Sequence, residues 1–164
     1  MAESFWWASP LGVSVGLFLA IGILWVLIGA LTVPFHSKAT GTEMIFVSHS
    51  TDTSYFGRSP SELLSSDVAL SKLRTLLLTV IAGFLLLAGF LFLSVAWFGL
   101  KQGQLWALVA LAVGGLLGMS FWALALLPYF RSGIPVTIGD LPPFMWIPAV
   151  LILPATLLGW LGLG

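Results

Sequence analysis

Residues 75–98 read TLLLTVIAGFLLLAGFLFLSVAWF, a run of 24 residues without an ionisable side chain. The hydrocarbon core of a bilayer is about 30 Å thick, so a helix needs roughly 20 apolar residues to cross it. Residues 11–33, 105–127 and 144–163 reach a similar length and also lack ionisable groups. Helices in soluble cores are rarely so long and so apolar on every side. The sequence therefore predicts an all-α integral membrane protein with four spans.

The composition of the chain indicates lipid as its solvent. Of the 164 residues, 59% are hydrophobic and 7% are charged, whereas soluble domains carry about 25% charged residues. Six basic and six acidic side chains balance without a basic run, so the electrostatic term that drives nucleic-acid binding is missing. The absence of cysteine excludes disulfides, thiolate metal sites and iron–sulfur clusters. We expect the lipid bilayer, and no nucleic acid, as a partner.

The connections between the spans predict how the helices follow one another. Residues 99–104 form a six-residue turn, so the second and third spans should make a tight helical hairpin. Residues 128–143 are too rich in proline and glycine for a long helix. Residues 34–74 form the longest connection and hold most of the polar side chains. We expect a single membrane domain, residues 1–164, folded as a four-helix bundle with one long polar loop between the first two spans.

Two helix starts are predicted inside residues 34–74. In the tetrapeptide SPSE at residues 59–62, the first serine can cap a helix, the proline suits the first helical position and the glutamate completes a capping box. Ser66 or Asp67 then caps a second helix that continues into the second span. Residues 68–98 would extend roughly 46 Å at 1.5 Å per residue. The first two turns of this helix should therefore project beyond the bilayer.

The basic residues predict an orientation. The long loop and the connection after the third span carry five of them, Lys38, Arg58, Lys72, Arg74 and Arg131, whereas the side with the termini has only Lys101. Because cytoplasmic loops are enriched in Lys and Arg, this count favours a cytoplasmic long loop with both termini outside.

The stretch YFGRSPSELLSSDVALSKLR at residues 55–74, followed by an apolar span that ends in AWFGLKQGQLWAL, resembles small uncharacterised four-helix bacterial membrane proteins. The likeness covers roughly residues 55–127 and includes the short turn from Gly99 to Trp106. It implies a four-helix architecture in a bacterial inner membrane, and it implies no activity. In that group a basic turn is cytoplasmic and both termini are inside. The resemblance and the charge count therefore predict opposite orientations, and the orientation stays open.

A search for catalytic and metal-binding groups finds little. Proton relays and coupled transporters use ionisable residues inside the membrane, and the four spans have none. The two histidines, His36 and His49, lie outside the spans, where they cannot serve as mid-membrane haem ligands. Ser48, His49 and Asp52 superficially suggest a triad, but a triad is defined by geometry, and a solvated histidine is the simpler interpretation. A metal ion could be gathered by His36, His49, Asp52 and Glu43, but no recurrent ligand spacing supports this. We expect no enzyme activity, no cofactor and no metal.

The spans do contain a signal for helix packing. Small residues recur every four positions in the first and third spans, which places them on one helix face: Gly12, Gly16, Ala20, Ala110, Gly114 and Gly118. Such faces let helix backbones approach closely and gain dispersion contacts that lipid does not supply. We expect the two spans to meet along these faces, either within one bundle or between protomers.

Two functional hypotheses follow from the sequence. The first is a non-enzymatic accessory or scaffold subunit that packs through its helix faces against other membrane subunits or against itself. The alternative is a binder or carrier of a quinone, lipid or carotenoid, with Trp25 and Trp122 as candidate contacts because both lie in mid-span. The fourth span would contribute to this site, because Pro148 and Pro154 should kink it and free carbonyls for neighbouring helices.

Overall fold

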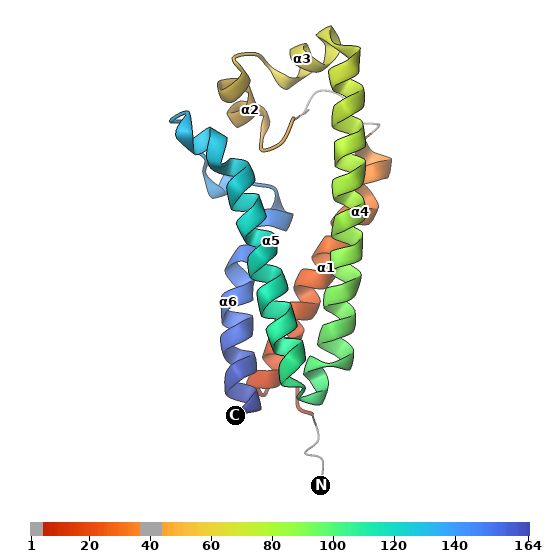
Figure 1. Ribbon diagram of the computed structural model, residues 1–164, viewed down its shortest axis with the longest axis vertical. Helices are drawn as coiled ribbons and strands as arrows, with labels where there is room; N and C mark the ends of the chain where they lie inside the picture. Colours follow the sequence, from red (N-terminus) through yellow and green to blue (C-terminus); the bar gives the residue numbers. More distant parts are fainter. Residues whose placement is uncertain (1–4, 37–43) are drawn as a thin grey trace.

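A computed structural model describes residues 5–36 and 44–164, with the side chains of residues 33–36 excepted (Figure 1). The described residues form helices and no strand. Four helices are long and apolar enough to cross a membrane: α1 (Pro10–His36), α4 (Val68–Phe98), α5 (Leu105–Arg131) and α6 (Pro143–Leu163). They contain the four predicted spans, and they suggest a membrane protein.

The predicted helix starts in the long connection are confirmed. Helix α2 (His49–Phe56) precedes α3 (Pro60–Ser66), where the Ser59 hydroxyl accepts the Glu62 N–H at 3.3 Å. Helix α4 begins after Asp67, whose carboxylate accepts the N–H groups of Ala69 and Leu70 at 2.8 and 3.2 Å. The first turns of α4 extend beyond the other long helices to the end that carries α2 and α3 (Figure 1).

A short turn joins α4 to α5, as the sequence predicts. It consists of the single 3₁₀ turn η1 (Leu100–Gln102), closed by Gly103 in the left-handed region (φ 74°). At Gly99 an added Cβ would lie 2.6 Å from the Cβ of Ala107, so a glycine is needed where the helices meet. Away from the turn the two helices separate (Figure 1), because α4 packs mainly on α1 and α5 packs mainly on α6.

Helices α1 and α4 run antiparallel and touch through small residues spaced seven apart. Gly22 and Gly29 of α1 face Gly89 and Ala82 of α4. A Cβ added at Gly89 would lie 2.7 Å from the carbonyl oxygen of Gly22, and one added at Gly29 would lie 2.7 Å from that of Ala82. Because these neighbours are backbone atoms, the backbones of the two helices are in direct contact at both positions.

Helix α6 packs against both α1 and α5. The buried Ser14 hydroxyl of α1 donates to the Ala155 carbonyl at 2.6 Å. A Cβ added at Gly159 would meet Ser14 and Leu108 at 2.7 and 2.6 Å, which joins the three helices at one level. The main core lies among the four long helices and includes Val15, Phe18, Ile21, Leu111 and Ile152.

The backbone contact between α1 and α4 predicts a sharp difference between two glycines of α4. Gly89→Ala should destabilise the fold by about 1–3 kcal/mol, because its methyl group can only be accommodated if the helices move apart. Gly83→Ala is the matched control, since a Cβ there meets nothing within 4 Å. Thermal unfolding in mild detergent measures both variants, and equal unfolding temperatures would contradict the proposed contact.

Candidate functional site

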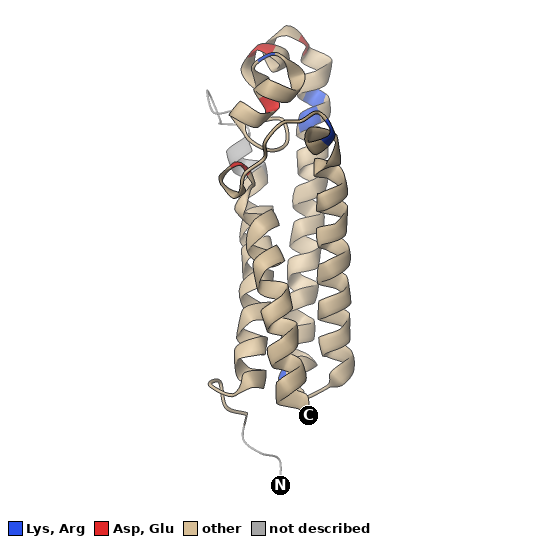
Figure 2. Ribbon diagram, turned by 90° about the vertical axis from the view of Figure 1, so that its left-hand side faces the viewer, with Lys and Arg blue, Asp and Glu red and all other residues tan. Residues whose placement is uncertain are grey.

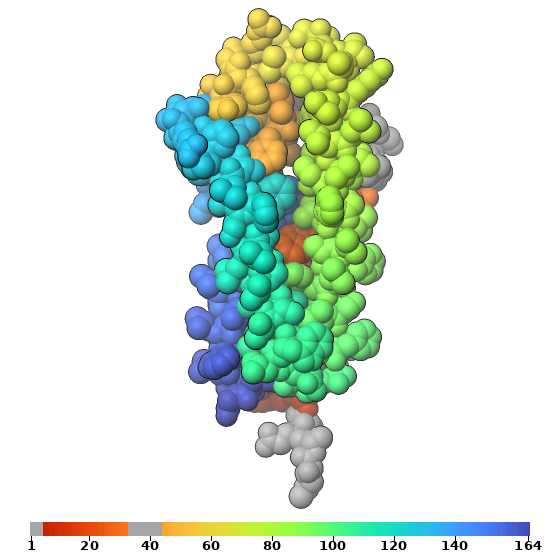
Figure 3. All heavy atoms as spheres, in the orientation of Figure 1, coloured from red at the N-terminus to blue at the C-terminus, as the bar shows by residue number. Residues whose placement is uncertain are grey.

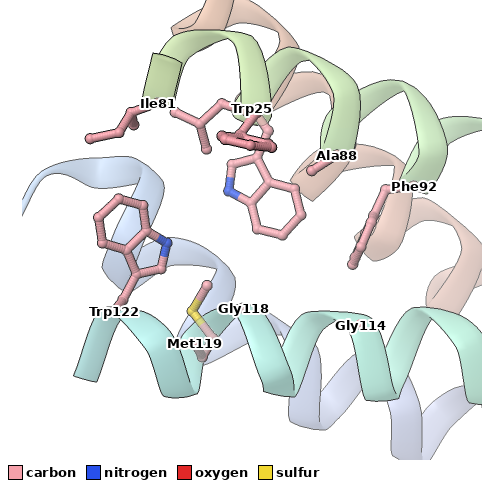
Figure 4. A pocket seen from close by; sticks show the side chains of 10 residues that line it. Trp25, Ile81, Ala88, Phe92, Gly114, Gly118, Met119 and Trp122 are labelled. Carbon is pink, nitrogen blue, oxygen red and sulfur yellow. The ribbon is translucent and has the colours of Figure 1, made fainter. Parts of the chain in front are cut away.

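A cavity of about 270 Å³ lies between α4 and α5. The space-filling view shows it as an opening between these helices, with α1 visible at its back (Figure 3). Helix α4 contributes an apolar wall formed by Ile81, Phe84, Leu85, Ala88 and Phe92. Helix α1 contributes Trp25, and α5 contributes Gly114, Gly118, Met119 and Trp122 (Figure 4).

The cavity exists because α5 presents glycines where larger side chains would fill the space. A Cβ added at Gly118 meets nothing within 4 Å, and one added at Gly114 is 3.9 Å from the Phe92 ring. The separation of α4 and α5 beyond their turn leaves this region open to the outside of the helices (Figure 3). An opening on that side would face acyl chains if the helices cross a bilayer.

Trp25 forms the back of the cavity and is held rigidly. It is 4% exposed, and its ring meets Phe92 edge to face at 4.8 Å. Its indole N–H donates to the Phe144 carbonyl of α6 at 3.2 Å. That carbonyl lacks its usual helical donor, because the residue four positions later is Pro148. The sequence predicts that neighbouring helices take up carbonyls freed by proline, and Trp25 does so here.

Trp122 forms the end of the cavity nearest to α2 and α3. Its ring contacts Phe144 at 5.3 Å and Phe46 at 6.0 Å between centroids. The nitrogen-bearing edge of the indole faces the cavity in Figure 4. Among the described residues this N–H donates no hydrogen bond, and it is not fully buried, so it is open to a molecule in the cavity.

The lining side chains determine which chemistry the cavity can perform. They are aromatic, aliphatic or thioether groups, and none is an acid or a base at neutral pH. The cavity therefore has no group for proton transfer or nucleophilic attack. It offers dispersion contacts, ring edges and faces, and a single free N–H donor, which suit the retention of an apolar molecule.

The segment next to the cavity is organised by the fully buried carboxylate of Asp52. Its Oδ2 accepts the N–H groups of Ile45 and Phe46 at 2.6 and 2.9 Å. Its Oδ1 accepts the N–H of Val47 at 3.3 Å and the hydroxyl of Tyr129 at 2.9 Å. These bonds join residues 45–52 to the end of α5 and place Phe46 beside Trp122.

A second carboxylate, Asp140, holds the other side of this segment. It lies in the 3₁₀ turn η2 (Ile138–Asp140) and accepts both the hydroxyl and the N–H of Thr137, at 2.7 and 2.9 Å. The Ser48 hydroxyl, at the N-cap of α2, donates to Asp140 at 3.1 Å. These bonds, that from the Thr137 hydroxyl above all, lower the pKa of Asp140 to about 2.

The polar residues singled out in the sequence do not form a triad. Ser48 bonds Asp140, Asp52 bonds backbone N–H groups and Tyr129, and His49 is exposed at the start of α2. In the described part of the chain, no three acidic or histidine side chains lie close enough to hold a metal ion. The side chain of His36, together with Lys38 and Glu43, lies outside the described residues.

The two small-residue faces are not arranged as the sequence analysis expects. The main neighbours of α1 are α4 and α6. Gly12 packs against the backbone of Trp6 and Trp7, Ala20 is exposed, and a Cβ at Gly16 meets nothing within 4 Å. Ala110 and Gly114 are exposed on α5 and Gly118 lines the cavity. In the described residues the two faces therefore have different neighbours, and contact between protomers stays a prediction.

A spacing of four does not predict the small residues that join α1 to α4. The spacing that matters is seven, which brings Gly22 and Gly29 of α1 against Gly89 and Ala82 of α4. Small residues at heptad spacing are the sequence signal that both pairs share. By contrast, no local signal links Asp52 to Tyr129, which lies 77 residues later.

Comparison of the chain with protein-family models, with curated proteins and with solved structures gave no match. The geometry of the cavity and of its neighbouring segment is therefore the basis for a functional assignment.

The role of Asp52 predicts the behaviour of two substitutions. Asp52→Asn should speed amide hydrogen exchange in residues 44–52 by about tenfold or more, because it replaces a charged acceptor of several bonds. Tyr129→Phe removes one bond and should have a smaller effect, of about fivefold. Asp67→Asn is the control, since it alters an exposed helix cap that asparagine also serves. Equal exchange in Asp52→Asn and the wild-type protein would contradict this role.

Proposed function

We propose that the protein is a multi-pass protein of a bacterial inner membrane, a four-helix bundle that binds an apolar small molecule in the cavity between α4 and α5. The observation that carries the proposal is a cavity of about 270 Å³ with an aromatic wall that opens between two apolar helices. Sites for small molecules are concave and mainly apolar, with a few placed polar groups. An opening between the helices admits molecules dissolved in the bilayer directly.

The distribution of charge supports insertion in a membrane. Charged residues gather at the end of the molecule that carries α2 and α3 (Figure 2). At the other end, Lys101 lies 3.6 Å from the ring centroid of Trp97 and within 6 Å of the rings of Phe5 and Trp7. Tryptophan rings and lysines are typical of the membrane–water interface. Between these ends the outer faces of the long helices carry exposed apolar side chains.

The size of the cavity limits its occupant. An apolar cavity of about 150 Å³ holds benzene in another protein. The present volume of about 270 Å³ is nearly twice as large, which corresponds to a substituted ring or a fused pair of rings. A longer attached chain would leave through the opening between the helices and lie in the lipid.

A second candidate function is the accessory or scaffold role, in which another helix packs on α5. The observation that favours it is the exposure of Ala110 and Gly114 on one face of α5. Small residues at this spacing allow close approach of a partner helix. In this case a protein subunit, or a second copy of the chain, would accompany the protein on purification instead of a small molecule.

The bundle predicts that cysteines introduced at Ser50 and Gln104 react with an impermeant thiol reagent from opposite sides of the membrane. Both positions are exposed, and the chain has no cysteine of its own. Gln104 is preferable to Gly103, whose φ of 74° disfavours a side chain. Labelling in intact spheroplasts and in inverted vesicles measures the sidedness and also decides the orientation. Reaction of both cysteines from the same side would show that α4, which lies between them, does not cross the membrane once.

The ligand proposal predicts a loss of bound molecule when the cavity is filled. Gly118→Leu places a side chain in open space, so the fold should persist while ligand occupancy falls about tenfold or more. Gly83→Leu makes the same change on α4 outside the cavity, where a Cβ also meets nothing within 4 Å. Native mass spectrometry after mild extraction measures the stoichiometry of bound apolar molecules in each variant.

The two candidate functions give different results in this experiment. A molecule that is present in the wild-type protein and in Gly83→Leu, but absent in Gly118→Leu, would support the ligand site. A co-purifying protein subunit without a stoichiometric small molecule would support the scaffold role instead and count against the ligand site.

A further inference from the structure

The two tryptophans of the cavity differ in the state of their indole N–H groups. The N–H of Trp25 is used within the protein, because it donates to the Phe144 carbonyl at 3.2 Å. The N–H of Trp122 faces the cavity and has no acceptor among the described residues (Figure 4). An indole N–H is a donor only. The cavity therefore presents one free hydrogen-bond donor in an otherwise apolar lining.

We infer that the ligand carries a carbonyl oxygen on a flat ring, as a quinone does, and that this oxygen accepts a hydrogen bond from Nε1 of Trp122. The inference rests on the proposed function and specifies the class of molecule bound. The lining side chains supply no strong acceptor, since Met119 offers only a thioether sulfur. A carbonyl therefore suits this site better than a hydroxyl group, which also has a proton to donate.

The depth of Trp122 separates this class from ordinary lipids. Trp122 lies five residues inside the end of the predicted span at residue 127, which is about 7 Å at 1.5 Å per residue. Ester carbonyls of phospholipids lie in the interfacial region, outside the hydrocarbon core. An acyl chain that entered the cavity would leave the donor unpaired, at a cost comparable to that of a lost hydrogen bond. An acceptor carried by a molecule that dissolves within the core would meet this donor directly.

The shape of the cavity favours a ring. Gly114 and Gly118 remove side chains from the α5 wall, so that a flat group can lie against the helix backbone. Phe92, Trp25 and Trp122 present aromatic rings along its length (Figure 4). Aromatic groups in offset or edge contact gain more than their buried area alone provides. The opening between α4 and α5 leaves a path for an isoprenoid tail into the lipid.

The experiment compares two probes of nearly the same shape, 2-methyl-1,4-naphthoquinone and 2-methylnaphthalene, of which only the first has carbonyl groups. Their binding to the full-length protein in nanodiscs is measured by equilibrium dialysis against empty nanodiscs, which corrects for partition into lipid. We expect the protein to prefer the quinone by about fivefold, the contribution of one net hydrogen bond.

Two matched variants test which indole provides this preference. Trp122→Phe should abolish the preference for the quinone; because the smaller ring also removes apolar contacts with both probes, the measure is the ratio of the two affinities. Trp25→Phe also removes an indole N–H from the lining, but one that is already bonded to Phe144. The preference should therefore persist in Trp25→Phe.

Infrared spectroscopy provides a test that does not depend on how well Trp122→Phe folds. The carbonyl stretching band of the bound quinone should move to lower frequency in the wild-type protein, because the C=O bond weakens when it accepts a hydrogen bond. An unshifted band, or equal affinity of the wild-type protein for the two probes, would overturn the inference and leave the apolar site intact. Failure of both probes to bind, with no co-purifying small molecule, would instead overturn the proposed function itself.

Discussion

The contact between the backbones of α1 and α4 at Gly22 and Gly89 sets the spacing of the helix pair against which α6 packs. Because neither glycine has a side chain, the two main chains touch. A Cβ at Gly89 would lie 2.7 Å from the Gly22 carbonyl oxygen. In an apolar solvent such contacts are a main source of helix association, because burial of apolar surface brings little gain there. The pair forms one side of the protein, and α6 packs on α1 at Ser14 and Ala155.

The position of α5 follows from that arrangement. Helix α5 is tied to α4 only near the short turn, and beyond it α5 packs chiefly on α6. The remaining space between α4 and α5 could be filled by large side chains, but α5 carries Gly114 and Gly118 there. The result is a cavity whose back wall is the ring of Trp25. This ring is held by a hydrogen bond to the Phe144 carbonyl, which has no helical donor because residue 148 is proline. Glycine and proline, two residue types that usually weaken helices, thus create the site.

Local signals in the sequence predicted the four long helices and the starts of α3 and α4, whereas α2 and the pairing of helices escaped them. The length of each apolar run, the SPSE tetrapeptide at residues 59–62 and the cap at Asp67 depend on neighbours within one helical turn, so they could be read directly. Trp25 and Trp122 were identified as candidate ligand contacts because of their mid-span position, and both line the cavity. The choice of α4 as the partner of α1 depends on which small faces match at a spacing of seven. The bond from Tyr129 to Asp52 joins residues that no local pattern relates.

The contact of Phe46 with Trp122 connects the end of the protein that carries α2 and α3 to the cavity. Phe46 is held by Asp52 through its own N–H, at 2.9 Å, and its ring lies 6.0 Å from that of Trp122. Any displacement of the Trp122 ring is therefore also a displacement of the packing surface of Phe46. This coupling is reciprocal. A molecule in the cavity that stabilises one position of Trp122 also stabilises one arrangement of residues 44–52, and a change in residues 44–52 alters the position of Trp122 with the same coupling free energy.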